Sequence, residues 1–116
     1  MSVLMEPVSG ALEYRVCETA VLEIGGDTGA LIIYSDEDMV GEEIEICRPG
    51  ELDTRVHNVV RARRAPVGLV YAAVFPALTG GEYDVLGEDG KPCREATVSG
   101  GRVTEVNCRK ACALHR

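Results

Sequence analysis

Basic side chains at alternating positions make residues 55–64 the stretch of this sequence best suited to binding chemistry. The stretch contains four arginines and one histidine but no acidic residue. Every second side chain of a β-strand points to the same face, so one face of a strand here would carry Arg55, His57, Arg61 and Arg63. Guanidinium groups bind carboxylates in a bidentate manner. We therefore expect this face to bind an anionic ligand or an acidic surface, with His57 as a titratable neighbour.

Acidic side chains dominate the preceding stretch, residues 36–45, which contains no basic residue. Its six carboxylates belong to Asp36, Glu37, Asp38, Glu42, Glu43 and Glu45. The end of the stretch alternates like a strand, with Glu43 and Glu45 on the face opposite to Ile44. Since consecutive strands commonly pair, we expect both glutamates to lie near Arg55, His57 and Arg61. Each cross-strand pair of opposite charges would contribute about 0.2–1 kcal/mol. A solvated loop followed by the outer face of a strand is the purely structural interpretation.

Two other kinds of chemistry are compatible with the residue types. A metal site could combine His57 with Glu43 or Glu45, or the cysteines Cys108 and Cys112 with His115, but no spacing matches a known site. A hydrolase could use Cys47 and His57 as a nucleophile and base on neighbouring strands, although the sequence lacks a G-x-S-x-G elbow. The sequence therefore predicts no catalytic residue, no metal ligand and no cofactor.

Length, charge and cysteine content limit the possible classes of protein. A chain of 116 residues is long enough for one domain with a core of its own. The net charge of −7 argues against a nucleic-acid partner, because phosphate contacts need a basic surface. No signal-peptide pattern and no apolar run of about 18 residues is present, which predicts a cytoplasmic protein without a membrane segment. Five cysteines, an odd number without a C-x-x-C pair, indicate free thiols.

Alternation and glycine-rich turns predict the strands that position the basic stretch. A half-buried strand is expected from Thr19 to Ile24, and the turn at residues 25–29 leads into a further strand instead of the helix of a phosphate loop. The runs 30–34 and 69–75 are apolar on both faces, as in strands that are covered on both sides or contact another subunit. Pro66 ends the basic strand.

Turn signals separate the later strands. Pro-Gly at residues 49–50, Gly-Gly at 80–81 and Asp-Gly at 89–90 predict reversals, and Gly-Gly at 100–101 predicts a tight antiparallel hairpin. Together these patterns predict an all-β fold, a single antiparallel β-sandwich of about seven to eight strands. The sandwich would span residues 19–108, after an arm or edge segment at 1–18 and before a basic tail at 109–116.

The segment from Val74 to Asn107 resembles the closing half of prealbumin-like sandwich modules of the carboxypeptidase-regulatory and Cna-B type. The resemblance covers about a third of the chain and includes Phe75, Leu78, Gly81, Tyr83, Val85, Val98 and the Gly100–Gly101 turn. It implies a prealbumin-like or immunoglobulin-like sandwich that serves as an accessory, adhesive or binding domain without catalysis. The internal Lys-Asn bond of Cna-B modules is not carried over, because the only lysines are Lys91 in a turn and Lys110 in the tail.

A longer similarity covers residues 25–46 and 71–83, which resemble a group of small uncharacterised actinobacterial proteins. It implies a fold and no activity. We therefore expect a non-catalytic binding or assembly module of a larger cytoplasmic complex. Its Arg/His face would contact an acidic protein partner or another copy of the chain.

Overall fold

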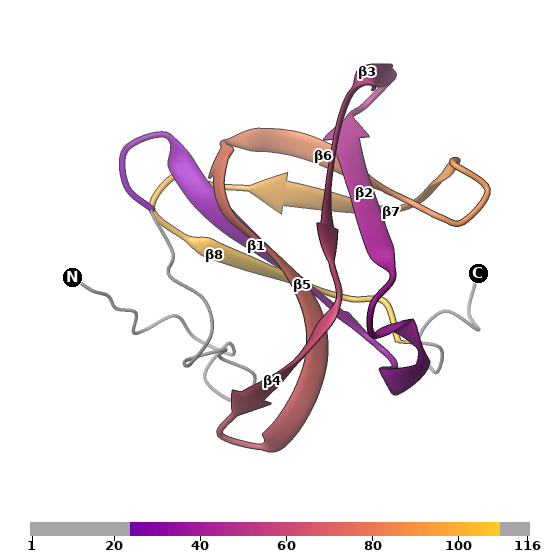
Figure 1. Cartoon of the computed structure of the whole chain (residues 1–116). Coiled ribbons are helices and arrows are strands. Elements are labelled where there is room, and N and C mark those ends of the chain that lie inside the picture. The colour runs from indigo at the N-terminus through magenta and orange to yellow at the C-terminus, as the bar shows by residue number, and fades with distance from the viewer. Residues whose placement is uncertain (1–23, 110–116) are drawn as a thin grey trace.

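The computed structural model of the chain describes residues 24–109 and contains two β-sheets in that range (Figure 1). The elements are β1 (Thr28–Ser35), the 3₁₀ turn η2 (Glu37–Met39), β2 (Glu43–Arg48), β3 (Glu51–Val59), β4 (Arg61–Ala65), β5 (Gly68–Thr79), β6 (Gly81–Leu86), β7 (Pro92–Val98) and β8 (Val103–Asn107). The first sheet has the strand order β4-β5-β1-β8 and the second β3-β2-β6-β7. The prediction of an all-β, sandwich-like fold is confirmed at this level.

The main apolar core lies between the two sheets. Leu31 and Ile33 of β1 and Phe75 of β5 belong to the same buried cluster as Ile46 of β2 and Val85 of β6. With no tryptophan and one phenylalanine, the core consists mostly of aliphatic side chains, which suit the pleated surface of a sheet. Tyr83, expected to be a core or corner tyrosine, is buried here and its hydroxyl donates to the Thr79 carbonyl at 2.6 Å.

Strand β1 is buried on both faces, as its continuous apolar run predicts. It lies in the middle of the first sheet, antiparallel to β5 and parallel to β8. Its second face belongs to another buried cluster, in which Ile32 and Tyr34 join Val70, Ala72 and Val74 of β5. The parallel pairing with β8 shows that the prediction of a purely antiparallel sandwich is wrong at this strand.

The Gly100–Gly101 turn does not close the predicted hairpin, because β7 and β8 lie in different sheets. The turn packs instead against the turn that precedes β1: Gly101 N–H donates to the Thr28 carbonyl at 2.8 Å, and a side chain on Gly100 would collide with the Gly26 carbonyl. Ala30 N–H donates to the Arg102 carbonyl at 3.0 Å. These contacts direct β8 along β1 instead of back along β7.

The other predicted turns are present. Pro49–Gly50 connects β2 to β3, Gly80–Gly81 takes the chain from one sheet to the other, and Asp89–Gly90 closes the β6–β7 hairpin. Gly50, Gly81 and Gly90 all have positive φ angles, which glycine adopts without strain. The predicted arm at residues 1–18, most of the predicted strand at 19–24 and all but the first residue of the basic tail lie outside the described residues.

Candidate functional site

The basic stretch forms two strands in different sheets, so the prediction of one continuous strand is wrong. β3 ends at Val59 and pairs with β2, whereas β4 begins at Arg61 and pairs with β5. The chain changes sheets at Val60, whose side chain is fully buried. Val60 still continues the β2–β3 ladder, because its N–H donates to the Glu42 carbonyl and its carbonyl accepts from Gly41 N–H, both at 2.9 Å. A strand that bends from one sheet into the other is a common corner of β-sandwiches.

Asn58 holds this corner in place. Its side-chain amide nitrogen donates to the Val74 carbonyl of β5 at 2.7 Å, and its amide oxygen accepts from Val59 N–H at 2.8 Å. β5 pairs with β4 only as far as Ala72, so the Asn58 side chain supplies a partner where the neighbouring strand has left the sheet. Sequence reasoning missed this residue, and the one available signal was a polar amide at an inward position between Val56 and Val60.

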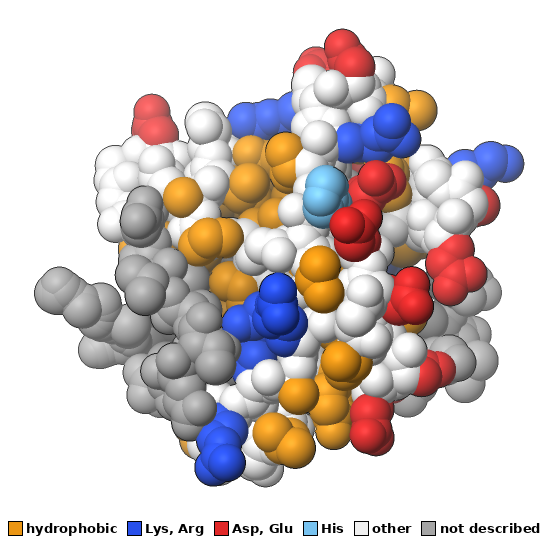
Figure 2. Space-filling model, in the orientation of Figure 1, with side chains coloured by type: hydrophobic (Ala, Val, Ile, Leu, Met, Phe, Trp, Pro, Cys, Tyr) orange, Lys and Arg blue, Asp and Glu red, His pale blue; other side chains and the backbone are white. Residues whose placement is uncertain are grey.

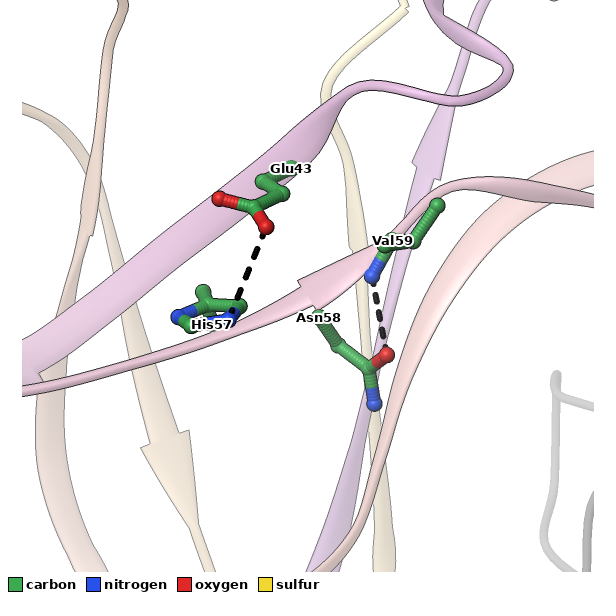
Figure 3. A network of polar contacts seen from close by, with 4 residues as sticks. All are labelled: Glu43, His57, Asn58 and Val59. Carbon is green, nitrogen blue, oxygen red and sulfur yellow. Dashed lines mark hydrogen bonds and ion pairs between the residues drawn. The ribbon is translucent and has the colours of Figure 1, made fainter.

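His57 and Glu43 lie side by side on the outer face of the second sheet, as predicted. Figure 3 shows the two side chains pointing toward one another across β2 and β3, while Asn58 points to the other side of β3. The distance from His57 Nε2 to Glu43 Oε2 is 3.6 Å, and Glu45 lies directly opposite His57 in the strand register. Both side chains of the His57–Glu43 pair are more than half exposed, so the contact contributes little to stability.

Arg61 and Arg63 lie on the first sheet, on the face that carries Val70 and Ala72, their partners across β4 and β5. Arg63 is only 6% exposed, and its Nε donates to the Ala72 carbonyl at 3.0 Å. Burial lowers the pKa of Arg63, and the neighbouring charge of Arg61 adds to this effect. The predicted exposed face of four basic residues is therefore wrong in two respects. Arg63 is buried, and Arg61 belongs to a different sheet from Arg55 and His57.

The structure gives no support to a cysteine nucleophile. Cys47 is 2% exposed, and burial, followed by the charge of Asp84, raises the pKa of its thiol. A nucleophilic cysteine needs a lowered pKa, and His57, its proposed base, contacts Glu43 instead. Among residues 24–109 no group of three or more His, Cys, Asp or Glu side chains is placed to hold a metal ion. The proposed ligands Cys112 and His115 lie outside that range.

The feature that remains is an open sheet edge formed by β3. Among the described strands, β3 pairs only with β2, and its residues from Glu51 to His57 are all exposed. Val60 directs its N–H toward β2, and successive residues of an antiparallel strand alternate in direction. The backbone groups of His57 therefore point away from β2, toward solvent.

Exposed hydrophobic side chains occur along the same stretch of the chain, from β3 to the start of β5. The large hydrophobic residues that the described part of the chain exposes most are Val40, Leu52, Val56, Val67 and Leu69. Leu52 and Val56 lie on β3, whereas Val67 and Leu69 lie at the β4–β5 hairpin. Figure 2 shows hydrophobic side chains exposed between basic and acidic ones on this side of the molecule. We call the surface of β3, β4 and the start of β5 the β3–β4 edge.

Comparison of the chain with protein-family models, with curated proteins and with solved structures finds no match. The structure describes no helix that is both long and apolar enough to cross a membrane within residues 24–109. The β3–β4 edge is therefore the surface from which a function of this chain can be inferred.

Proposed function

We propose that this protein is a non-catalytic binding or assembly module of a larger complex, and that the β3–β4 edge is its contact surface. The observation that carries the proposal is the exposure of β3 from Glu51 to His57, with one neighbour among the described strands. An exposed edge offers unpaired N–H and C=O groups to an incoming strand. Proteins use such edges to bind extended segments of a partner.

Side chains at this edge support the same function. Leu52 and Val56 are 50% and 43% exposed, which leaves apolar area that a partner would remove from water. Arg55 and His57 are exposed on the same strand, Arg61 is exposed at the start of β4, and all three suit a partner that carries carboxylates. A protein partner with an acidic, partly apolar segment or a second copy of this chain fits both properties.

Charge reversal at exposed positions of the edge tests the proposal. The variant R55E/R61E removes two guanidinium groups without touching the buried Arg63. We expect the wild-type chain to assemble with itself, or to retain a specific protein from an extract of cells that express it. The double variant should bind either partner about tenfold or more weakly. Light scattering measures self-assembly, and titration calorimetry with the purified partner measures the affinity.

Arg102 supplies the matched control, because it is exposed in the turn before β8, away from the β3–β4 edge. The R102E variant should bind like the wild type, and all variants should give the same circular dichroism spectrum. Equal binding by R55E/R61E and the wild type would contradict the proposal. A wild-type chain that stays monomeric and retains no protein would contradict it as well.

A further inference from the structure

We infer that β3 pairs in antiparallel fashion with β3 of a second copy, around a two-fold axis at Thr54. This inference depends on the proposed function, since it assigns the partner of the β3–β4 edge. Two four-stranded sheets would then form one continuous eight-stranded sheet. The side chains of β3 would themselves recognise the same strand of the second copy.

The charges of β3 are complementary to their own reverse order. When two copies align antiparallel with Thr54 opposite Thr54, Asp53 lies opposite Arg55 of the other copy. Glu51 then lies opposite His57, and Leu52 lies opposite Val56. The two-fold axis produces each of these pairs twice. Opposite charges directly across an antiparallel ladder stabilise it, and like charges destabilise it.

Neighbouring registers are less favourable. Alignment around Arg55 places two arginines opposite each other, although it also pairs Asp53 with His57, and alignment around Val56 places Arg55 opposite His57. In the register around Thr54, His57 already directs its backbone groups to the open side of β3. Asp53 and Arg55 lie in the irregular part of the strand, and they would form a hydrogen-bonded pair once β3 is regular.

The exposed apolar side chains of β3 would be covered by the same pairing. Val56 and Leu52 are both about half exposed in the single chain. Opposite one another in the dimer, they would form a small apolar contact on each side of the axis. No other described strand occupies this edge.

A bulge in β3 opposes this pairing in the single chain. The register with β2 shifts after Ile46, so four residues of β3, Leu52 to Arg55, lie opposite the single residue Cys47. Thr54 holds the bulge, because its hydroxyl accepts from Arg48 N–H at 3.1 Å and donates to the Glu51 carbonyl at 2.7 Å. Bulges in edge strands commonly prevent strand addition. The inference therefore requires β3 to straighten over Leu52 to Arg55 when the two copies pair.

Charge swaps between positions 53 and 55 test the register directly. D53R and R55D each create two like-charge pairs, so each variant should dimerise at least about tenfold more weakly than the wild type. The double swap D53R/R55D restores every pair and should recover the dimer. An equimolar mixture of the two single variants should form a heterodimer, which native mass spectrometry distinguishes by mass.

Several outcomes would overturn the inference. A wild-type chain that is monomeric at all concentrations excludes the self-pairing. A dimer that neither the double swap nor the mixture restores has a different interface. Exposed positions carry both substitutions, and heterodimer formation itself would show that each variant is folded. R61D changes a basic residue outside β3, so it should leave the dimer unaffected. If the chain is monomeric but retains an acidic partner that R61D releases, the self-pairing is wrong and the proposed function stands.

Discussion

Strands β1 and β3 are opposite extremes of the same sandwich. Every residue of β1 after Thr28 is buried, whereas every residue of β3 up to His57 is exposed. β1 lies between two strands in the middle of its sheet, and β3 has one neighbour among the described strands. The two differ in position more than in local structure, since both are extended chains with antiparallel partners.

The difference separates the residues that hold the fold together from those available for contact. Burial of Leu31 and Ile33 on one face and Ile32 on the other makes β1 the strand on which both apolar clusters depend. β3 contributes Asn58 and its ladder with β2, but none of its residues is a member of either buried cluster of the described chain. Substitutions in β3 can therefore change binding without unfolding the protein, which is the property a contact strand needs.

The largest effect is expected from shortening a core side chain of β1. Ile33→Ala removes a side chain that is fully buried between the sheets, and should lower the free energy of unfolding by about 2–5 kcal/mol. Val56→Ala, on β3, shortens a side chain that is 43% exposed and should cost less than about 1 kcal/mol. Urea denaturation followed by circular dichroism measures both. Similar losses in the two variants would refute the division between the strands.

A smaller effect is expected at the corner where the exposed strand enters the core. Asn58→Ala leaves the Val74 carbonyl and Val59 N–H without their side-chain partner, and should cost about 1–3 kcal/mol. The neighbouring substitution His57→Ala removes only the exposed contact with Glu43 and should cost less than about 0.5 kcal/mol. Thermal unfolding compares the two. If Asn58→Ala is as stable as His57→Ala, the corner does not depend on this amide.

Two of the three arginines of β4 show the same distinction within one strand. Arg63→Ala removes a buried guanidinium that donates to the Ala72 carbonyl, and should cost about 1.5–3 kcal/mol. Arg61→Ala changes an exposed side chain two residues away and should alter stability by no more than about 0.5 kcal/mol. Urea titrations of the two variants under the same conditions compare their unfolding midpoints. Equal midpoints would mean that the Arg63 hydrogen bond contributes nothing.

Local sequence patterns predicted the strands whose structure depends on local chemistry. The apolar run of β1 predicted a strand covered on both faces, and Asp89–Gly90 predicted the β6–β7 hairpin, because turn geometry depends on the turn residues themselves. The change of sheet at Val60 was not predictable from alternation. Val60 points inward whether the strand continues or bends, so the period of two is the same in both cases.

Contacts between distant segments account for the other errors. The Gly100–Gly101 turn has the composition of a hairpin, but its fit against Gly26 and Thr28 joins residues more than 70 positions apart. The burial of Arg63 likewise depends on β5 and not on the alternation of β4. In the candidate site, residue types predicted the His57–Glu43 contact correctly, because consecutive strands paired as expected. They did not predict which arginines remain exposed.

The smallest predicted effect compares two carboxylates, one beside each strand. Glu105 accepts from the Tyr34 hydroxyl of β1 at 2.7 Å, and burial raises its pKa although this hydrogen bond acts in the opposite direction. Because the folded protein holds this proton more tightly than the unfolded chain, its stabilising effect is present in acid and is lost as the pH rises through the folded pKa. Glu105→Gln cannot ionise and can still accept from Tyr34. It should therefore melt slightly higher than the wild type near neutral pH, and the difference should disappear in acid.

Glu43→Gln, beside β3, is the matched control, since its side chain is 56% exposed and it should change the melting temperature very little at either pH. Thermal scans at neutral and acidic pH measure both variants. A Glu105→Gln variant that is less stable than the wild type at neutral pH would mean that the hydrogen bond to Tyr34 outweighs burial. The buried side of the sandwich would then tolerate a charge as well as the β3–β4 edge does, and the contrast between β1 and β3 would apply to apolar side chains alone.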